Sequence, residues 1–314
     1  MKIAFWSNCG EKCNVSSNLA AISVASVIRY PYSVVLVENR LSNHNLGKAF
    51  TGNSIRRLRE DAGTNYYDGD GIEGLLRKIY RNNGCIAADH NIVVNSSITT
   101  NGSIATNNRI ITNDSYAVLR PYLKEIINQH LYYIPQGHIL HNEIFEYEFN
   151  HCFQPLLQLL KGNFNICMLH AASQKNLSTK TILQEADLIV VNLNQNRYYL
   201  EDFFDNYSSM IPKAVFIISN YDSEALLSRA RISWEYRIPL ENILAIPDNV
   251  SYQNAYHCSS VIEFIYHNYS CPKTNPNYTF IQAIKKAAFQ IIKRAEASAR
   301  ELSAKNEGLV MYCE

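Results

Sequence analysis

The residues most able to do chemistry lie in a short polar stretch near the N-terminus, between two apolar segments. Residues 2–6 (KIAFW) have the pattern of a buried strand, residues 7–15 (SNCGEKCNV) are mostly polar, and residues 16–27 (SSNLAAISVASV) fit a helix that packs on a sheet. A strand, a tight polar loop and a helix N-terminus together offer N–H groups and partial positive charge to an anion. This order predicts a phosphate-binding unit, with Ser16 or Ser17 as the helix N-cap.

The loop lacks most of the residue types that a Walker-type phosphate loop requires. Such a loop uses several glycines to wrap the phosphates and a lysine to neutralise them, but Gly10 is the only glycine here. If Ser16 supplies the hydroxyl, Asn14 stands at the last glycine position and Val15 at the lysine position. If Gly10 is instead the last glycine, Glu11 stands at the lysine position. Both alignments therefore predict a loop without its lysine.

Two later segments resemble a known family when they are taken together with the first 29 residues. Residues 32–39 (YSVVLVEN) and 186–193 (ADLIVVNL) are similar to strands of the ParA/MinD family of P-loop proteins, which belong to the SIMIBI class. More narrowly, the chain resembles degenerate ParA/MinD-like proteins found beside tight-adherence (Flp-type) pilus machinery. The resemblance follows most of the chain in the order of its elements. It implies a nucleotide-binding fold with degraded Walker motifs.

The resemblance also implies roles for residues at two strand ends. In the family, an acidic residue after the second strand helps to hold magnesium, and Glu38 or Asn39 stands at that position. Another family strand ends in an aspartate and a glycine that sense the γ-phosphate and magnesium, whereas His170 follows the matching strand at 164–169. Without that carboxylate, little remains to organise magnesium or an attacking water. We therefore expect no catalytic residue and no metal site, a structural role for His170, and weak or absent binding of ATP or ADP.

The base side of the implied nucleotide site is better preserved than the phosphate side. Asn220 follows the strand at 214–219, where the family has an asparagine that reads the adenine ring. Pro247 and Asp248 follow the last expected strand, where the family has a proline that lines the base pocket. The implied nucleotide-binding residues are Gly10, Asn14, Val15, Ser16, Ser17, Asn220, Pro247 and Asp248.

Strands that alternate with helices along the chain predict an α/β fold with a doubly wound, mainly parallel sheet flanked by helices. The expected strands are 2–6, 33–38, 131–134, 164–169, 187–193, 214–219 and 243–246. The expected helices are 16–27, 54–61, 72–80, 116–130, 143–160, 176–185, 199–207, 224–232, 261–267 and 280–305. Pro121 is expected in the first turn of its helix, and Pro155 is expected to kink or restart its helix.

The chain is expected to form one ParA/MinD-like α/β domain over residues 1–273, followed by a C-terminal helical extension over 274–314. A polar, asparagine-rich segment at about 91–113 is expected as short irregular strands or a loop at the sheet edge. The apolar stripe of the last helix is rich in alanine, which gives little area for membrane insertion. We expect its first half, through Ile292, to pack on the sheet and its second half to project or to meet a protein partner.

Composition excludes several classes of protein. The 314 residues are 47% hydrophobic, which is enough for a large core, and a net charge of +1 indicates no nucleic-acid partner and no membrane attraction of the whole protein. No apolar run reaches the length of a membrane-spanning helix, and no signal peptide is visible, so a cytoplasmic protein is expected. Recruitment to the inner face of the membrane by partners is left open. The 8 scattered cysteines are expected as reduced thiols, with Cys9 and Cys13 the only close pair.

Two functions are consistent with these features. The first is a non-hydrolysing ParA/MinD-like scaffold or localisation factor for a cell-envelope or pilus assembly, with protein partners such as pilus or secretion machinery. The second is an active ParA/MinD-type ATPase with a deviant P-loop that dimerises on ATP. A homodimer is compatible with both. The missing carboxylate after the strand at 164–169 favours the first, in which the chain is not an enzyme.

Overall fold

The computed structural model describes residues 1–39, 46–50, 71–81, 114–135, 142–173 and 175–310. Its strands are β1 (Lys2–Trp6), β2 (Val34–Asn39), β3 (Lys124–Ile127), β4 (Leu131–Ile134), β5 (Ile166–Ala171), β6 (Leu188–Leu193), β7 (Ala214–Tyr221) and β8 (Ile243–Pro247). Its α-helices are α1 (Val15–Arg29), α3 (Ile72–Arg81), α4 (Asp114–Leu119), α5 (Asn142–Asn163), α6 (Leu177–Glu185), α7 (Arg197–Asn206), α8 (Arg229–Glu235), α9 (Val250–His257), α10 (Val261–Asn268) and α11 (Tyr278–Val310). Its short 3-10 helices are η1 (Gly10–Cys13), η2 (Leu46–Ala49), η3 (Arg120–Tyr122), η4 (Ser208–Lys213) and η5 (Leu240–Asn242).

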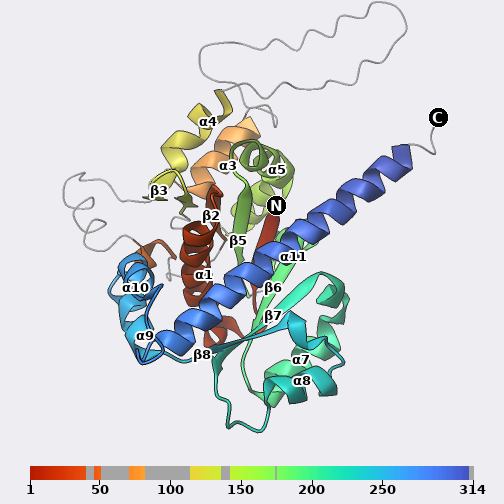
Figure 1. Cartoon of the computed structure of the whole chain (residues 1–314). Coiled ribbons are helices and arrows are strands. Elements are labelled where there is room, and N and C mark those ends of the chain that lie inside the picture. Colours follow the sequence, from red (N-terminus) through yellow and green to blue (C-terminus); the bar gives the residue numbers. More distant parts are fainter. Residues whose placement is uncertain (40–45, 51–70, 82–113, 136–141, 174, 311–314) are drawn as a thin grey trace, which may run out of the picture.

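The described strands form one sheet in the order β3-β4-β2-β5-β1-β6-β7-β8 (Figure 1). Every neighbouring pair is parallel except β3 with β4 at one edge. β1 lies in the middle between β5 and β6, so the polar loop that follows it emerges at the centre of the carboxyl edge. The predicted doubly wound, mainly parallel α/β sheet is therefore confirmed.

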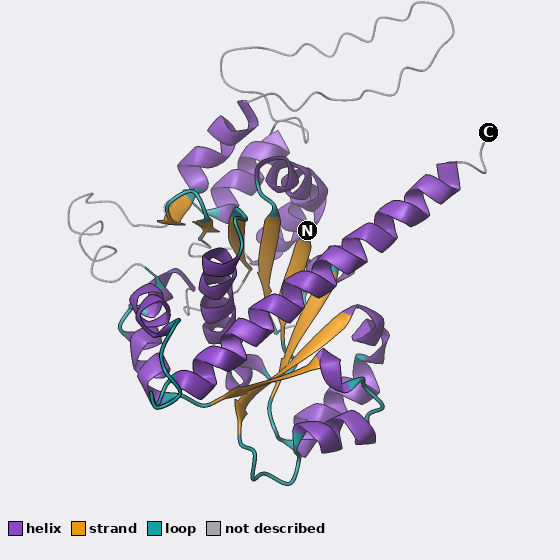
Figure 2. Cartoon of the chain, in the orientation of Figure 1, coloured by secondary structure: helices purple, strands orange, loops and turns teal. Residues whose placement is uncertain are grey.

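Helices cover both faces of the sheet, as Figure 2 shows. Because side chains alternate along a strand, Ile3 and Phe5 of β1 join one buried cluster while Ala4 and Trp6 join the other. The first cluster includes residues of α1, α10 and α11, and the second includes residues of α3, α5, α6 and α7. Burial on both faces explains why these strands are apolar throughout rather than alternately polar.

The helix expected over 116–130 is wrong. α4 ends at Leu119, Pro121 lies in the first turn of η3, and Lys124–Ile127 form the antiparallel strand β3. Proline cannot continue the hydrogen bonding of an α-helix. The residues after Pro121 find hydrogen-bond partners instead along the open edge of β4. The sequence stretch has helical spacing, but pairing at the sheet edge decides its structure.

α5 and α11 are longer than expected. α5 runs as one helix from Asn142 to Asn163 with Pro155 inside it, so the expected restart at this proline does not occur. α11 has 33 residues, crosses one face of the sheet and extends beyond it (Figure 1). Its buried side chains run from Phe280 to Ala295, which confirms that its first half packs into the core. Tyr32 adds a hydrogen bond from its hydroxyl to Glu296 Oε1, at 2.7 Å.

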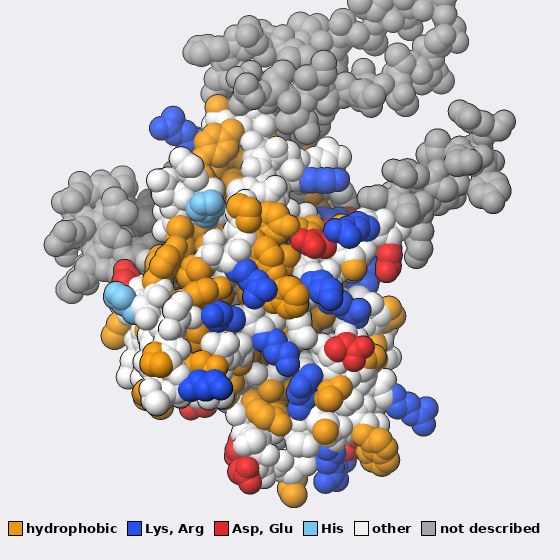
Figure 3. Space-filling view, viewed as in Figure 1, with side chains coloured by type: hydrophobic (Ala, Val, Ile, Leu, Met, Phe, Trp, Pro, Cys, Tyr) orange, Lys and Arg blue, Asp and Glu red, His pale blue; other side chains and the backbone are white. Residues whose placement is uncertain are grey.

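Two sequence expectations lie outside the described residues, namely the helix at 54–61 and the polar segment at about 91–113. In the part of the chain that is described, no helix is both long and apolar enough to cross a bilayer. Figure 3 shows lysine and arginine side chains scattered among hydrophobic ones on the face that carries α11.

The buried stripe of α11 generates a stability prediction. Ile284→Ala should lower the free energy of unfolding by about 2 to 5 kcal/mol, because it removes buried methyl groups and leaves a cavity against the sheet. The exposed Lys286, two residues away on the same helix, provides the control, and Lys286→Ala should change the value by less than about 0.5 kcal/mol. Urea unfolding measures both. Equal effects of the two changes would show that α11 does not contribute to the core.

Candidate functional site

The polar loop after β1 contains a 3-10 turn, η1, rather than an open glycine-rich arc. Gly10 has φ +65°, a backbone conformation that residues with side chains rarely adopt. The one glycine of the loop therefore allows the backbone to turn at this point. Lys12 precedes α1 in the sequence, and its Nζ donates to Tyr199 Oη at 2.9 Å. This hydrogen bond raises the pKa of Lys12. Lys12, the only lysine of residues 7–15, is therefore bonded to a side chain of α7.

A disulfide joins Cys9, which directly precedes η1, to Cys13, the last residue of η1. The expectation that all cysteines are reduced thiols is therefore wrong for this pair, whose Cα atoms lie 6.2 Å apart. A separation of four residues in one tight turn brings two side chains within bonding range. The remaining described cysteines are free, namely Cys152, Cys167, Cys258 and Cys271. Burial raises the pKa of the Cys167 thiol to about 12, which keeps this thiol protonated and unreactive.

Asn14 and Asn220 connect the loop to the end of β7. Asn14 precedes α1 with φ 51° and makes no side-chain cap bond, so neither serine acts as the N-cap that the sequence predicts. Its Nδ2 instead donates to Oδ1 of Asn220 at 2.7 Å, and Asn220 also has φ 51°. The structure thus brings together one residue from the implied phosphate side and one from the implied base side.

A buried carboxylate, Glu38, lies at the carboxyl end of β2 and is 2% exposed. The N–H of Leu46 donates to both of its oxygens, at 2.9 and 3.1 Å, and the hydroxyl of Tyr133 donates to Oε2 at 2.5 Å. A carboxylate needs such donors when it leaves water. Glu38 is therefore held inside the protein by donors from its own chain.

His170 links Glu38 to the start of α1. Its Nδ1 lies 3.8 Å from Oε1 of Glu38, an ion-pair distance, and its Nε2 lies 3.3 Å from Oγ of Ser16, a hydrogen-bond distance. Hydroxyl, imidazole and carboxylate in this order are the groups of a nucleophile-and-base relay. His170 is only 2% exposed and Ser16 9%, so a reacting group has little access to either. The contact joins the carboxyl ends of β2 and β5 to the N-terminus of α1.

Asn18 forms a second buried polar network that the sequence reading missed. Its Nδ2 donates to Oδ1 of Asn192 and to Oγ of Ser219, each at 2.9 Å, and Ser219 Oγ donates to the carbonyl of Cys13 at 2.8 Å. A signal for this network was present in the sequence, because Asn18, Asn192 and Ser219 each lie inside an otherwise apolar segment. Buried amides and hydroxyls require hydrogen-bond partners, so three such residues could have been expected to meet. This network holds α1 against β6 and β7 and fixes the end of the loop.

The other implied nucleotide-binding residues lie around the same edge. Val15 is buried at the start of α1, and the carbonyl of Ser17 accepts a hydrogen bond from Tyr252 Oη at 2.5 Å. Pro247 ends β8 opposite Tyr221 of β7, so it lies next to the strand end that carries Asn220. Asp248 is exposed and accepts a hydrogen bond from Gln253. Within the described ranges, no three side chains of the His, Cys, Asp and Glu types gather closely enough to hold a metal ion.

The architecture matches solved structures although the sequence is far from them. A ParA family ATPase from Chlorobium tepidum aligns with a TM-score of 0.61 at 13% identity, over 92% of this chain and 97% of that one. The fold is that of the ParA/MinD ATPases. The septum site-determining protein MinD of Pyrococcus horikoshii, complexed with Mg-ADP, aligns with a TM-score of 0.55 at 13% identity, over 95% and 99% of the two chains.

A chain of the MinC:MinD cell division protein complex of Aquifex aeolicus gives a similar result. It aligns with a TM-score of 0.58 at 12% identity, over 93% of this chain and 96% of that one. No protein-family model matches the sequence, and no curated protein sequence matches it either. The likeness at these identities therefore concerns the ParA/MinD-like fold.

The disulfide generates a direct chemical prediction. Trypsin cuts after Lys12, between the two cysteines, so a non-reducing peptide map should contain residues 3–12 linked to residues 13–29. The sample should be alkylated in denaturant before digestion to block exchange by the free thiols. Reduction of the same sample should release the two peptides separately. A non-reduced map dominated by peptide 3–12 with an alkylated Cys9 would contradict the disulfide.

The buried carboxylate generates a second prediction. Tyr133→Phe should lower the free energy of unfolding by about 2 kcal/mol, because it removes a hydrogen bond to a charged, buried acceptor. Tyr198→Phe is the matched control, since Tyr198 is 71% exposed and should tolerate the same change within about 0.5 kcal/mol. Denaturant unfolding of the two variants measures the difference. A loss of less than about 0.5 kcal/mol for Tyr133→Phe would mean that Glu38 does not depend on this donor.

Proposed function

We propose that this protein is a non-hydrolysing member of the ParA/MinD-like fold that acts as a scaffold or localisation factor for a cell-envelope assembly. The observation that carries the proposal is the contact of His170 with Ser16 and Glu38. These are the three positions at which the resemblance implies a loop hydroxyl, a γ-phosphate sensor and a magnesium-holding acid. Here they contact one another, so the edge is stabilised by its own side chains.

The residues at this edge do not fit magnesium. Magnesium prefers an octahedral set of oxygen ligands supplied by carboxylates, phosphates and water. Both oxygens of Glu38 already accept hydrogen bonds from Leu46 and Tyr133, and an imidazole occupies the space between Glu38 and Ser16. Phosphoryl transfer depends on metal and lysine charges at the transferred group, so we derive no hydrolytic step for this site.

The loop supports the same proposal for nucleotide binding. The disulfide and the bond from Asn14 to Asn220 hold it in a shape made by its own side chains, and Lys12 is bound to Tyr199. Any ATP or ADP then binds weakly, through the N-terminus of α1 and the base-side residues. The alternative, an active ATPase that dimerises on ATP, requires this loop to open and a partner to supply the missing lysine.

The assignment to a partner rests on the fold and on the sequence resemblance. The Aquifex aeolicus neighbour is a complex of MinD with a protein partner, MinC, and the proposed scaffold role assigns this chain a protein partner as well. The tight-adherence pilus enters through the sequence resemblance alone. Co-purification of the chain with components of such a pilus, from a cell that encodes both, tests that part of the proposal separately from the chemistry.

We expect negligible ATP turnover by the purified protein. Loss of a single electrostatic stabiliser of phosphoryl or acyl transfer typically costs two to three orders of magnitude in rate, and two are missing here. A coupled assay for ADP release measures the rate, and Ser16→Ala identifies any activity of a contaminant, which it should leave unchanged. A steady turnover of about 1 per minute or faster that Ser16→Ala abolishes would overturn the proposal.

We expect magnesium to have no effect on nucleotide affinity. Calorimetric titration of ATP should give a dissociation constant that differs by less than about twofold between buffers with magnesium and buffers with a chelator, because Glu38 already accepts hydrogen bonds at both oxygens and no described group of three such side chains is placed to hold the ion. ADP, titrated under the same two conditions, is the matched control ligand. A tenfold or greater tightening of ATP binding by magnesium would show that the edge rearranges into a working site.

A further inference from the structure

A cavity of about 520 Å³ lies on the opposite side of β1 from α1, between α6 and η4. Trp6 and Ile189 contribute to it from neighbouring strands of the sheet, and Leu183 and Met210 contribute from the two walls. Its volume is within the range of small-molecule sites, which run from about 300 to 1,000 Å³. None of the residues implied for nucleotide binding lines it, so it is a separate site.

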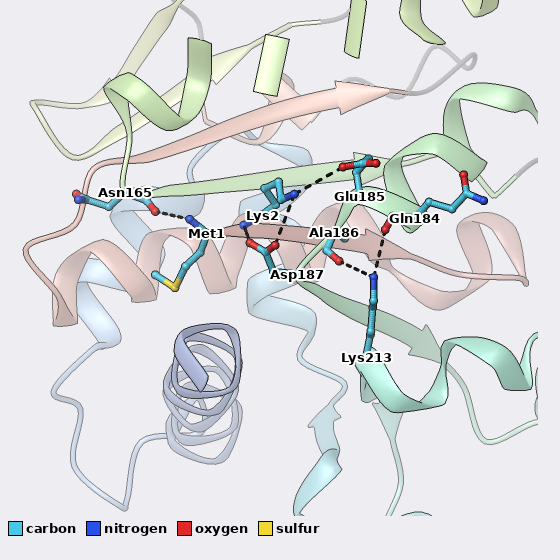
Figure 4. A network of polar contacts seen from close by, with 8 residues as sticks. All are labelled: Met1, Lys2, Asn165, Gln184, Glu185, Ala186, Asp187 and Lys213. Carbon is cyan, nitrogen blue, oxygen red and sulfur yellow. Dashed lines mark hydrogen bonds and ion pairs between the residues drawn. The ribbon is translucent and has the colours of Figure 1, made fainter. Parts of the chain in front are cut away.

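The charged side chains that line the cavity are all cations. Lys175, Lys180 and Lys213 belong to the lining, and no Asp or Glu does. Lys213 Nζ donates to the carbonyls of Gln184 and Ala186 at 3.2 and 3.4 Å, which fixes η4 to the end of α6 (Figure 4). Lysine ammonium groups attract an anionic ligand more strongly in a partly desolvated cavity than they do at an open surface.

Lys175 and Lys180 differ from Lys213 in their contacts. Lys175 Nζ lies 5.3 Å from the ring centroid of Tyr207, at the side of the cavity, and none of the ion pairs among the described residues includes Lys180. Both side chains are exposed, so their ammonium groups can turn towards a bound anion. The cavity therefore has two cations that are available to a ligand and a third that shapes its wall.

Two buried N–H donors among the lining residues add to this charge. Nε1 of Trp6 and Nδ2 of Asn176 have no hydrogen-bond partner within the described part of the chain, and Trp6 is 2% exposed. Oδ1 of Asn176 accepts from the N–H of Thr179, which orients the amide at the start of α6. A buried donor without an acceptor costs free energy. An acceptor-rich ligand would satisfy donors of this kind.

The aromatic and apolar side chains of the cavity indicate that its ligand also has an apolar part. The rings of Trp6 and Tyr207 lie 4.9 Å apart at 59°, and Leu183, Ile189 and Met210 complete an apolar lining. Burial of apolar surface in such a lining favours binding at about 25 cal/mol per Å². A purely inorganic anion would leave this lining in contact with water.

We propose that this cavity binds an organic anion, a small molecule with a flat apolar body and a carboxylate, sulfonate or phosphate group. The apolar body contacts Trp6 and Tyr207, and the acidic group faces Lys175 and Lys180. Binding here is independent of the phosphate loop and of nucleotide.

The two tryptophans of the chain allow a direct test. Trp234 is 81% exposed and Trp6 is buried at the cavity, so Trp234→Phe leaves Trp6 as the single reporter. The probe is 8-anilinonaphthalene-1-sulfonate, and its uncharged analogue N-phenyl-1-naphthylamine is the control ligand. The sulfonate should bind at one site per chain and quench Trp6 emission with saturation. A titration without saturable quenching of Trp6 would overturn the proposal.

Charge specificity is tested in the same Trp234→Phe background. The double change Lys175→Gln and Lys180→Gln should weaken the sulfonate about fivefold, about 1 kcal/mol, and leave the uncharged analogue within twofold. Lys273→Gln, at an exposed lysine outside the cavity, should alter neither probe. An equal loss for both probes, or a change below twofold for the sulfonate, would show that the site does not select anions and would overturn the proposal. Unchanged circular dichroism verifies that each variant is folded.

Discussion

The burial of one carboxylate, Glu38, imposes a constraint on the carboxyl edge of the sheet. A carboxylate taken out of water must be compensated; the segment after β2 and strand β4 supply hydrogen-bond donors, and His170 of β5 lies at ion-pair distance. Ser16 extends the chain of contacts to α1. Because β2, β5 and β1 are neighbours in the sheet, a single polar cluster occupies the area where ligands of open α/β sheets bind. The edge is stabilised from within.

Much of the fold could be predicted because each central strand is apolar on both faces. Ile3 and Phe5 pack in the core on one face of the sheet, and Ala4 and Trp6 pack in the core on the other. The strand at 2–6 could therefore be predicted from its own residues, without knowledge of the neighbouring strands. At the sheet edge this logic fails. The stretch 116–130 has the spacing of a helix, and pairing with the edge of β4 makes residues 124–127 a strand instead.

The site was less predictable than the fold. The absence of a lysine at the Walker position of the loop was evident, since it depends on residue types at fixed spacing. The contact of Glu38 with His170 joins residues far apart in the sequence, and side-chain meetings of this kind follow only from the packed structure. The disulfide was misjudged because the pair matches no metal or secretory pattern, while the turn of η1 alone brings Cys9 and Cys13 together.

Asn14 and Asn220, both with positive φ and joined through their amides, have a consequence for the time scale of binding. The N–H groups at the start of α1 are preceded by a loop that is hydrogen-bonded to the end of β7, and an anion can reach them only past this loop. Association then has to wait for the loop to open, so its observed rate should level off at high ligand concentration instead of rising with each collision. The rate at which the hydrogen bond between the two asparagines breaks therefore sets the upper limit of the rate of ligand association at this edge of the sheet.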